Sequence, residues 1–434
     1  MAGSDARETA LSVLTSCRKA EAWADGALKT ASRPLSRKDA ALAARLTYGV
    51  LQNRALLDFH ISRYCKKKIR DLEPVILDIM RIGAYQILFL DRVPDSAAVN
   101  RAVEMAKVHR RPQAAGMVNA ILRQLSREKE QLPQPEELSV RYSHPKWLTD
   151  RYVELLGREE AEKALAEDNR PVPTVLQRNP LRASEKELLA GLDGAEVTPH
   201  PWLRGCYELT GAGNLEQLES FQKGEFLVQD AAAALVPRVA GCAPGQRVID
   251  VCAAPGGKSF AAAMAMEDRG EVLSFDIHLH KIRLIEEGAD RLGITCVRAA
   301  VRDARMPDPE LQGTADVVLC DVPCSGLGII RKKPDIRYKD PAPLAGLPPV
   351  QLAILESAAG YVKKGGVLVY STCTILPEEN RQVVDQFLQK DGRFALEPFT
   401  AEGPVGETEG DVTLWPHRHQ TDGFYICKLR KNHD

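Results

Sequence analysis

The chain has 434 residues, of which 44% are hydrophobic and 27% are charged, and its formal net charge is -1. At roughly 150 residues per domain this length predicts about three domains, and the composition excludes collagen-like and intrinsically disordered proteins. No apolar run approaches the roughly 18 residues that a membrane-spanning helix needs, so we expect a cytoplasmic protein that contacts no membrane.

The first third of the chain is predicted to be entirely helical. Between residues 5 and 130 apolar side chains recur at helical spacing, with no strand-like alternation. Glu73-Pro74 opens one helix with Pro in its first turn, and further helices are expected over residues 96–108 and 113–128. A Leu-Pro-Gln-Pro stretch ends this part, which gives an all-helical domain over residues 1–132.

This helical part is also the basic part of the chain. Residues 1–150 contain 25 Lys and Arg against 17 Asp and Glu, a net charge of +8, whereas residues 151–434 contain 33 against 42, a net charge of -9. A basic module joined to an acidic one is typical of an appended domain that binds a polyanion. A chance excess of charge on a solvated surface is the alternative.

A small α+β module is expected next, over residues 140–223. Helical spacing continues over residues 147–167, residues 174–177 are strand-like, and a helix is expected over residues 184–192. Further short strands follow. The module links the helical domain to the rest of the chain.

From residue 224 onward, β-branched apolar runs alternate with helical segments. The predicted strands are 247–251, 271–275, 315–319 and 366–370, and the predicted helices are 258–266, 278–292, 350–363 and 378–390. This alternation predicts a Rossmann-like, doubly wound domain over residues 224–434, with a mainly parallel sheet and ligands at the carboxyl ends of its strands.

Three predicted strand ends of this domain carry residues suited to a nucleoside. The first strand runs into a turn of small residues, 252–257, and then into a helix, so backbone N–H groups can approach a ligand closely. Asp276 ends the second strand, where a carboxylate can accept hydrogen bonds from ribose hydroxyls. Asp303 follows a further strand expected between residues 275 and 303, where it can face an adenine edge. The alternative is that the glycines only mark a turn and that each aspartate caps a helix.

Two cysteines directly follow further strands of the same sheet. Cys324 lies in residues 321–326 (DVPCSG), and Cys373 lies in residues 370–374 (YSTCT). A single cysteine of this kind is usually a small buried hydrophobe, but two at strand ends of one sheet favour a chemical role. None of the ten cysteines forms a CxxC pair, so neither a disulfide framework nor a metal site is predicted. We expect the other eight to be structural.

Several motifs of the chain occur together in one known family. They are residues 250–258 (DVCAAPGGK), 321–326 (DVPCSG), 331–336 (RKKPDI) and 371–373 (STC). This set resembles the RNA cytosine-C5 methyltransferase family, which uses S-adenosyl-L-methionine. In the first third of the chain, residues 81–90 (RIGAYQILFL), 98–103 (AVNRAV) and 117–123 (MVNAILR) resemble the NusB-like RNA-binding domain of bacterial members. The resemblance implies a NusB-like domain followed by a class I methyltransferase domain.

The resemblance also implies which residues bind S-adenosyl-L-methionine. The loop at 252–258 surrounds the methionine moiety and the ribose, Asp276 binds the ribose, and Asp303 lies near the adenine. The implied cofactor-binding residues are Cys252, Ala253, Ala254, Pro255, Gly256, Gly257, Lys258, Asp276, Asp303 and Asp321. Lys258 has two interpretations, a helix-start lysine that faces solvent or a positive charge that lowers the pKa of Cys373.

The chemistry of cytosine methylation explains why two cysteines suit this family. C5 of cytosine is a poor nucleophile, so its methylation requires a covalent adduct at C6 that pushes electron density onto C5. By resemblance, Cys373 is the nucleophile that forms the adduct, and Asp321 supplies a proton or hydrogen bond at N3. The family assigns release of the product to the cysteine of the PCS motif, here Cys324.

The implied substrate is RNA with an unstacked cytosine, because the base must be reached from both faces. Arg331, Lys332 and Lys333 are predicted to hold phosphates beside the site, and a solvated loop is the alternative for this run of charge. Further residues that can contact phosphates on the helical domain are Lys66, Lys67, Lys68, Arg70, Arg110 and Arg111.

We expect the chain to methylate a specific cytosine of 16S ribosomal RNA, naked or in a partly assembled small subunit, and to act as a monomer. The nearest alternative is the same chemistry on a tRNA or 23S ribosomal RNA cytosine. Another is a NusB-like RNA-binding factor with an idle catalytic domain, against which the joint presence of Cys324, Cys373 and Asp321 argues. An exocyclic amino-group methyltransferase would need an Asn/Asp-Pro-Pro-aromatic motif, whereas residues 321–324 read Asp-Val-Pro-Cys.

Overall fold

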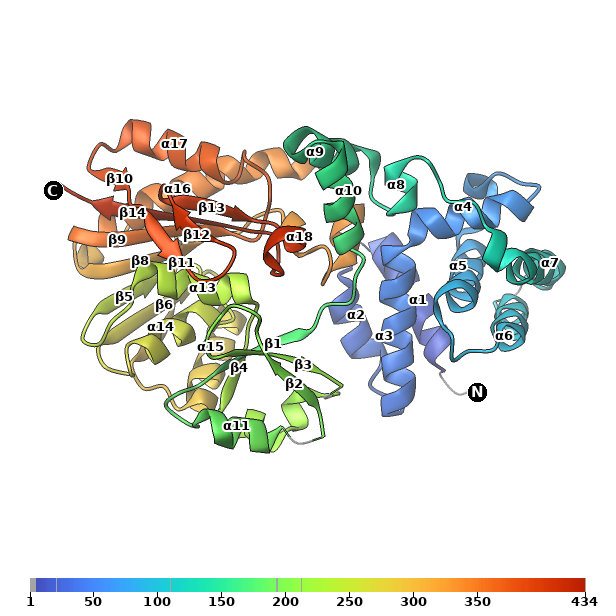
Figure 1. The fold of residues 1–434 in the computed structure, drawn as a ribbon, viewed down its shortest axis with the longest axis horizontal. Coiled ribbons are helices and arrows are strands. Elements are labelled where there is room, and N and C mark those ends of the chain that lie inside the picture. The colour runs from blue at the N-terminus through green and yellow to red at the C-terminus, as the bar shows by residue number, and fades with distance from the viewer. Residues whose placement is uncertain (1–4, 21, 110, 193, 212, 434) are drawn as a thin grey trace. The chain divides into compact units, whose positions relative to one another are not determined.

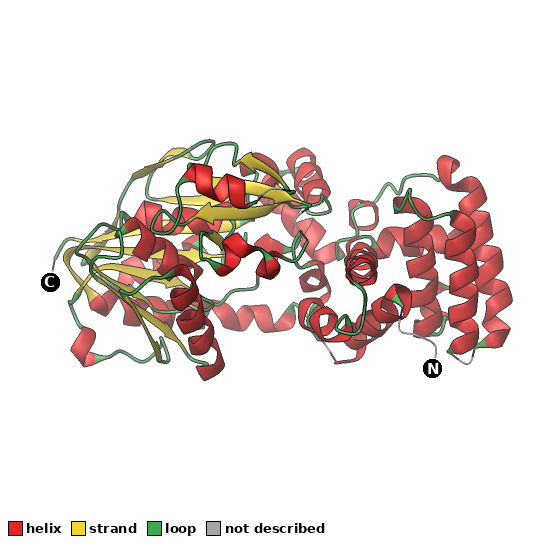
Figure 2. Ribbon diagram, turned by 90° about the horizontal axis from the view of Figure 1, so that it is seen from below, coloured by secondary structure: helices red, strands yellow, loops and turns green. Residues whose placement is uncertain are grey.

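The computed structural model describes residues 5–433 apart from residues 21, 110, 193 and 212. The chain forms two compact units, one of residues up to Arg170 together with Ile330–Asp340, and the other of Pro171–Ile329 with Pro341–Asp434. Helices make up the first unit, and the second combines strands with helices (Figure 1, Figure 2). The helices between residues 138 and 167 pack on the N-terminal ones, where the N–H of Leu56 donates to Oγ of Ser143 (3.0 Å). The domain bounds expected from the sequence stay a prediction.

The helical N-terminal domain predicted from the sequence is confirmed. Its helices are α1 (Ala6–Ala20), α2 (Ala24–Ala31), α3 (Arg37–Gln52), α4 (Arg54–Tyr64), α5 (Pro74–Phe89), α6 (Asp95–Val108), α7 (Pro112–Glu128), α8 (Leu138–Arg141), α9 (Lys146–Leu156) and α10 (Arg158–Glu167). Twelve of the sixteen residues of α5 are buried, among them Asp78 and Arg81, which form an ion pair with each other (2.8 Å). A Cβ at Gly49 of α3 would fall 1.9 Å from the ring of Tyr85 on α5, so these helices approach closely only with glycine there.

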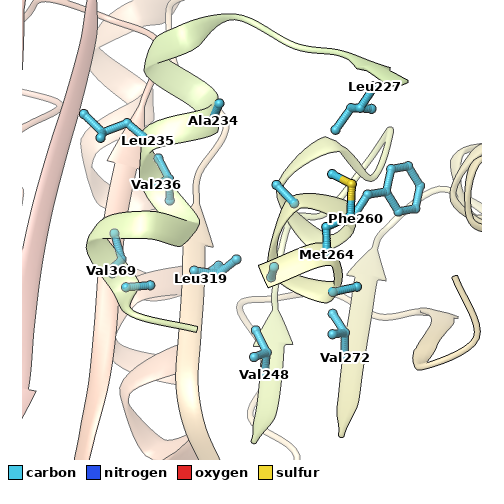
Figure 3. Packing of buried hydrophobic residues seen from close by; sticks show 14 of the residues in the cluster. Leu227, Ala234, Leu235, Val236, Val248, Phe260, Met264, Val272, Leu319 and Val369 are labelled. Atoms are coloured by element: carbon cyan, nitrogen blue, oxygen red, sulfur yellow. The ribbon is translucent and has the colours of Figure 1, made fainter. Parts of the chain in front are cut away.

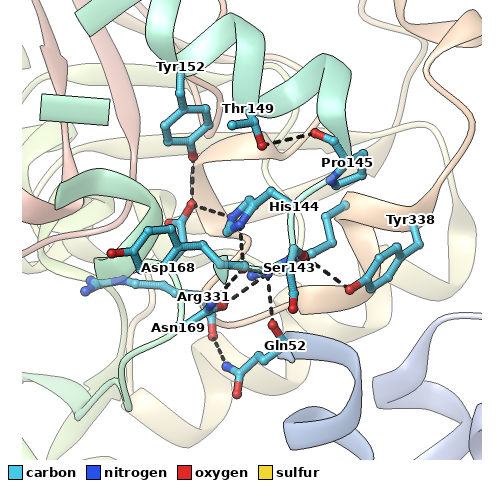
Figure 4. Close-up of polar contacts among 12 residues, drawn as sticks. Gln52, Ser143, His144, Pro145, Thr149, Tyr152, Asp168, Asn169, Arg331 and Tyr338 are labelled. Atoms are coloured by element: carbon cyan, nitrogen blue, oxygen red, sulfur yellow. Dashed lines mark hydrogen bonds and ion pairs between the residues drawn. The ribbon is translucent and has the colours of Figure 1, made fainter. Parts of the chain in front are cut away.

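The segment Ile330–Asp340 lies between two strands of the second unit in the sequence but packs within the first unit. Its Arg337 is fully buried and donates from Nη1 to the carbonyl oxygen of Ser143 (3.1 Å) and to Oδ1 of Asn169 (3.0 Å). Tyr338 donates its hydroxyl to the carbonyl oxygen of Leu51 (2.7 Å). Figure 4 shows Asn169, Ser143 and Tyr338 gathered around this contact. A buried guanidinium requires such partners, so they fix the segment to the helices.

The second unit begins with a small antiparallel sheet in the order β2-β3-β1-β4. Its elements are β1 (Thr174–Arg178), α11 (Glu185–Gly191), β2 (Glu196–Pro199), β3 (Cys206–Thr210), α12 (Glu219–Gln222) and β4 (Phe226–Val228). Leu176, Leu188 and Phe226 are buried together between the sheet and α11. Strands and helices are thus combined here, as the sequence predicts, and the bounds given for the α+β module, residues 140–223, stay a prediction.

The large sheet is mainly parallel, as predicted. Its strand order is β10-β14-β9-β8-β5-β6-β7, with β13 paired to β14. The strands are β5 (Arg247–Asp250), β6 (Glu271–Asp276), β7 (Val297–Val301), β8 (Ala315–Asp321), β9 (Val362–Thr372), β10 (Phe394–Leu396), β13 (Asp411–Leu414) and β14 (Phe424–Lys431), and β11 (Phe399–Ala401) pairs with β12 (Gly406–Thr408) apart from them. Because β7, β6, β5, β8 and β9 are parallel neighbours, their carboxyl ends share one edge.

Helices cover both faces of the large sheet. They are α13 (Ala231–Ala240), α14 (Gly257–Ala265) and α15 (Leu279–Leu292) on one face and α16 (Leu347–Tyr361) and α17 (Arg381–Lys390) on the other, with the short α18 (Pro416–His419) near the end of the chain. Successive residues of β5 point to opposite faces of the sheet. Val248 therefore belongs to the hydrophobic cluster on the face covered by α13, α14 and α15, and Ile249 to the cluster on the face covered by α16 and α17. Figure 3 shows Val248 and Val272 near Phe260 and Met264 of α14.

Among the described residues, no helix combines the length and the apolar character that crossing a bilayer requires.

Candidate active site

The ends of β8 and β9 bring Cys324 and Cys373 together. These strands are adjacent and parallel, and their last residues pair Asp321 with Ser371. The pairing continues beyond the strands, where the N–H of Val322 donates to the carbonyl oxygen of Ser371 (3.1 Å). The Sγ atoms of Cys324 and Cys373 lie 3.2 Å apart. Both cysteine residues are partly exposed.

The two thiols are not equivalent. The pKa of Cys324 is raised well above its ordinary value, first by its hydrogen bond with Cys373 and then by burial. A raised pKa favours the thiol form of Cys324, and either sulfur can donate the hydrogen bond of the pair. Since the thiolate is the nucleophilic form of cysteine, this arrangement favours Cys373 as the nucleophile.

Lys258 faces the site rather than solvent. Its side chain is 12% exposed, and its Nζ lies 2.6 Å from Oδ2 of Asp321, whose Oδ1 accepts the hydroxyl hydrogen of Ser371 (2.7 Å). Burial alone would lower the pKa of Lys258, but the charge of Asp321 and the hydrogen bond to it raise that pKa above its ordinary value. Cys373 also contributes to this rise, so the lysine is a positive charge held next to Cys373 and Asp321.

Asp250 lies at the end of β5, just before the predicted cofactor loop. It is fully buried, and burial is the main cause that raises its pKa from 3.8 to about 7. Ser259 donates its hydroxyl to Oδ2 of Asp250 (2.8 Å), and Ser274 donates to the hydroxyl oxygen of Ser259 (2.8 Å). This chain of hydrogen bonds joins β5, α14 and β6 beneath the loop.

Replacing Asp250 by Asn is expected to change how stability depends on pH. The carboxyl group titrates near 3.8 in the unfolded chain and near 7 in the folded protein, so the folded state binds more protons between these values. The unsubstituted protein should therefore lose stability as pH rises from 4 to 7, by roughly 4 kcal/mol at most, and Asp250→Asn should lose less. Urea unfolding of both proteins at pH 4.5 and pH 7.5 measures how much stability each loses as pH rises. Equal losses of stability in the two proteins would contradict the raised pKa of Asp250.

The turn after β5 has the shape of a ligand-binding loop. Gly256 has φ 109°, and a Cβ there would fall 2.3 Å from the ring of Phe260, so the turn requires glycine. The following helix, α14, begins at Gly257 and directs N–H groups of its first turn toward the loop. The loop thus offers backbone donors at the carboxyl edge of the sheet.

Asp276 ends β6 at the same edge. It is buried, its Oδ1 accepts the N–H of His278 (3.1 Å), and its Oδ2 lies 3.5 Å from Nζ of Lys281. The neighbouring Ile277 is 50% exposed, and Val301, which pairs with Asp276, is 49% exposed. A carboxyl group beside exposed apolar side chains suits a ribose and the apolar face of a base. Sequence analysis missed these apolar residues, although Ile277 directly follows the strand-end aspartate.

Asp303 follows β7, and its carboxylate is already bound by a neighbouring residue. Its carboxylate pairs with the guanidinium of Arg305 (2.6 Å) and accepts the N–H of the same residue (3.0 Å). The hydrogen bonds from Arg305 lower its pKa. An adenine edge would have to compete with this arginine, so the role predicted for Asp303 stays a prediction.

The basic run at residues 331–333 is only partly available for phosphate binding. Arg331 belongs to the segment packed in the helical unit, its side chain is 6% exposed, and its Nη1 lies 3.8 Å from Oε1 of Glu167. The residue is buried, and the phosphate contact expected of Arg331 stays a prediction. Lys333 is exposed and lies 3.6 Å from a carboxylate oxygen of Asp25. For Lys332 and Lys333 RNA binding stays a prediction.

The helical unit carries a basic cavity of about 650 Å³. Basic residues dominate its lining, which includes Arg18, Arg54, Lys68, Arg70 and Arg81 beside a single carboxylate, Asp58. Lys66, Lys67, Lys68 and Arg70 are exposed, in keeping with the phosphate contacts expected of them, whereas Arg110 lies outside the described residues. Among the residues that the structure describes, no group of three His, Cys, Asp or Glu side chains could hold a metal ion.

Comparisons with known proteins match nearly the whole chain. The family described as 16S rRNA methyltransferase RsmB/F matches residues 239–430, the NusB family matches residues 4–127, and a family described as an RsmF/B-like ferredoxin-like domain matches residues 144–216. The chain is 36% identical to the probable ribosomal RNA small subunit methyltransferase B of Bacillus subtilis over 98% of both chains. It is 33% identical to ribosomal RNA small subunit methyltransferase B of Klebsiella pneumoniae, over 92% of this chain and 91% of that protein.

Solved structures agree with these matches. The crystal structure of PH0851 is 27% identical with a TM-score of 0.80, covering 98% of this chain and 99% of that chain. The structure of NSun6 from Pyrococcus horikoshii with SFG is 25% identical with a TM-score of 0.59, covering 67% of this chain and 99% of that chain.

Proposed function

The chain belongs to the RsmB/F family of 16S rRNA methyltransferases, and on this premise we propose that it methylates C5 of a specific cytosine in 16S ribosomal RNA through a covalent bond between Cys373 and C6. The observation that carries the proposal is the pair of sulfur atoms 3.2 Å apart at neighbouring strand ends. One sulfur suits the attack on C6, and the other suits the release of the product.

S-adenosyl-L-methionine is the cofactor, and when bound it supplies an electrophilic methyl group on a sulfonium. The residues fit such a group: the turn at 252–258 offers backbone donors, and Asp276 lies beside exposed apolar side chains. In the proposal, Asp276 accepts hydrogen bonds from the ribose. The carboxylate of Asp303 releases Arg305 and binds the edge of the adenine instead. Asp321 and Lys258 stand at the reactive end of the same sheet edge.

The first step of the proposed reaction is addition of the Cys373 thiolate to C6 of the base. As the S–C6 bond forms, the C5–C6 double bond opens and electron density moves onto C5. N3 must receive a proton or a hydrogen bond at the same time, and Asp321 provides it. The ammonium of Lys258, 2.6 Å from Oδ2 of Asp321, is the adjacent proton source.

Formation of the adduct changes the pKa of Cys324, the residue that we propose as the base for product release. The largest cause that raises the pKa of Cys324 is its hydrogen bond with Cys373, and a sulfur bonded to C6 no longer offers a thiolate acceptor. Loss of this cause lowers the pKa of Cys324 once the adduct exists, so a larger fraction of it is thiolate, the form that can accept a proton. In the proposal the Cys324 thiol gives up its own proton to water, and its thiolate removes the C5 proton of the methylated adduct. The C5–C6 double bond re-forms as the Cys373 thiolate leaves, and N3 returns its proton to Asp321.

The RNA substrate must present an unstacked cytosine, which favours naked or partly assembled 16S RNA. The basic cavity of the helical unit is suited to backbone phosphates, since Arg54 and Lys68 line it and a single carboxylate, Asp58, lies among five basic residues. Binding that depends on such contacts weakens steeply as salt concentration rises.

Replacing Lys68 by Glu is expected to weaken RNA binding by a similar factor for every RNA sequence. Loss of one phosphate contact should reduce the slope of log affinity against log salt by about one. Affinity measured over a series of salt concentrations tests this result. Lys186→Glu, the same charge change at an exposed lysine of α11, is the matched control, and equal slopes for the two variants would contradict the role of the cavity.

Transfer of a labelled methyl group to protein-free 16S RNA tests the substrate, with tRNA and 23S RNA assayed in parallel. The proposal expects 5-methylcytosine in 16S RNA alone. Product confined to another RNA would retain the chemistry and reject the substrate. Absence of transfer to all three would favour an RNA-binding factor with an idle catalytic domain.

A further inference from the structure

Two buried polar residues that the proposed reaction does not use lie side by side just before α17. Glu379 and Asn380 are each 1% exposed, and they belong to the turn that precedes Arg381. Polar side chains buried this deeply cost free energy unless they are hydrogen-bonded. Their partners therefore indicate what the pair does.

Glu379 binds the loop that carries Cys324. Its Oε2 accepts the N–H of Ser325 (2.9 Å) and also accepts from Nε2 of Gln351 (2.9 Å). The same Nε2 of Gln351, a fully buried residue of α16, donates to the carbonyl oxygen of Pro323 (3.0 Å). Peptide groups on both sides of Cys324 are thus fixed by one carboxyl group and one amide.

Asn380 binds the loop that carries Cys373 in the same manner. Its Oδ1 accepts the hydroxyl hydrogen of Thr372, and its Nδ2 donates to the carbonyl oxygen of Thr374 (3.1 Å). Both threonines are fully buried and flank Cys373. The residues on both sides of the second cysteine are therefore fixed as well.

The two sets of contacts have a common origin in one short turn. Consecutive Cα atoms are about 3.8 Å apart, so the anchor points of Glu379 and Asn380 keep a constant separation. The hydroxyl of Tyr370 donates to the carbonyl oxygen of Glu379 (2.6 Å), which fixes the turn to β9. The spacing of the two cysteine loops, and hence the 3.2 Å contact of their sulfurs, depends on this turn.

We propose that Glu379 and Asn380 are positioning residues that hold the two cysteine loops in register, Glu379 for Cys324 and Asn380 for Cys373. The inference rests on the proposed function, in which Cys373 forms the adduct and Cys324 resolves it. The turn therefore controls two successive steps through two different side chains. Loss of either side chain should slow one step and spare the other.

Glu379→Ala and Asn380→Ala should have opposite kinetic signatures. Glu379→Ala is expected to slow resolution of the adduct about tenfold or more, as the loss of a buried hydrogen-bonding group predicts. Covalent protein–RNA adduct should then accumulate during turnover, with KM for RNA and affinity for S-adenosyl-L-methionine unchanged. Asn380→Ala should slow adduct formation by a similar factor, with no accumulation. Rapid-quench assays on 16S RNA with denaturing electrophoresis measure both steps.

Conservative variants separate positioning from general damage. Glu379→Gln keeps an oxygen that accepts from Ser325 and Gln351, so its adduct lifetime should lie within about threefold of the unsubstituted value. Gln351→Met removes the amide that holds Pro323 and should lengthen the adduct lifetime as Glu379→Ala does. Glu356→Ala is the matched control: it removes an ion pair between α16 and Lys390 of α17 (2.8 Å) and should change neither step.

Equal slowing of both steps by Glu379→Ala and Asn380→Ala would overturn the positioning role, and so would a Glu379→Gln protein that behaves like Glu379→Ala. If Glu379→Ala does not fold, Gln351→Met decides, and a normal adduct lifetime in that variant overturns the inference. Failure of the proposed function is distinct, since Cys324→Ala would then form no adduct with RNA. A trapped adduct in Cys324→Ala together with a normal lifetime in Glu379→Ala would reject the positioning role alone.

Discussion

Replacing Cys373 by Ala is expected to abolish methyl transfer to RNA, with a fall in kcat of about four orders of magnitude or more. The sulfur of Cys373 is the atom that we propose to bond to C6. Cys324 cannot replace it, because its sulfur lies 3.2 Å away and an attacking atom must lie close to the line of approach to the base.

Methyl transfer to 16S RNA and calorimetric binding of S-adenosyl-L-methionine should be measured together on this variant. Binding of the cofactor should persist, since the loop at 252–258 is unchanged. Cys242→Ala, which removes a partly buried thiol packed against the sheet core, is the matched control and should retain activity. A covalent RNA adduct formed by Cys373→Ala would overturn the assignment of the nucleophile.

Replacing Cys324 by Ala should have the reverse effect and trap a covalent protein–RNA adduct. The methylated adduct loses its C5 proton to a base, and removal of a general base costs about 10²- to 10⁴-fold in rate. The adduct should therefore accumulate and survive denaturing electrophoresis. The double variant Cys324→Ala with Cys373→Ala should form none. Rapid turnover by Cys324→Ala without a detectable adduct would contradict the release role.

Much of the fold follows from local sequence patterns. β-branched runs such as the one containing Val248 and Ile249 predict strands buried on both faces, and their alternation with helical segments predicts the parallel sheet that the structure contains. The predicted helix at 378–390 begins only at Arg381. Its start was wrong because Glu379 and Asn380 bind the two cysteine loops instead of joining the helix.

The packing of residues 330–340 could not be predicted from their own composition. A run of three basic residues suggests a solvated loop or a phosphate contact, yet Arg331 and Arg337 are buried in the helical unit. Their partners, Glu167 and Asn169, lie more than 150 residues earlier in the sequence. Burial of a charge depends on such distant partners, which no local pattern reveals.

Some residues of the candidate site could likewise be predicted from the sequence, and others could not. Cys324, Cys373 and Asp321 are identified by their position directly after strands, and the structure brings the two sulfurs into contact. The orientation of Lys258 could not be decided from the sequence, because its partner Asp321 is 63 residues away. Glu379 was missed for a related reason, since its partner is a backbone N–H in another loop, and a backbone group leaves no signature in the sequence.

The proposed mechanism depends most directly on which atom of the base receives the methyl group. 16S RNA carrying tritium at C5 of its cytosines would identify this atom, because methylation at C5 must expel the hydrogen bound there. The proposed mechanism predicts that one tritium is released to water for each methyl group transferred. Methyl transfer without release of tritium would contradict it, since the group would then have entered another atom.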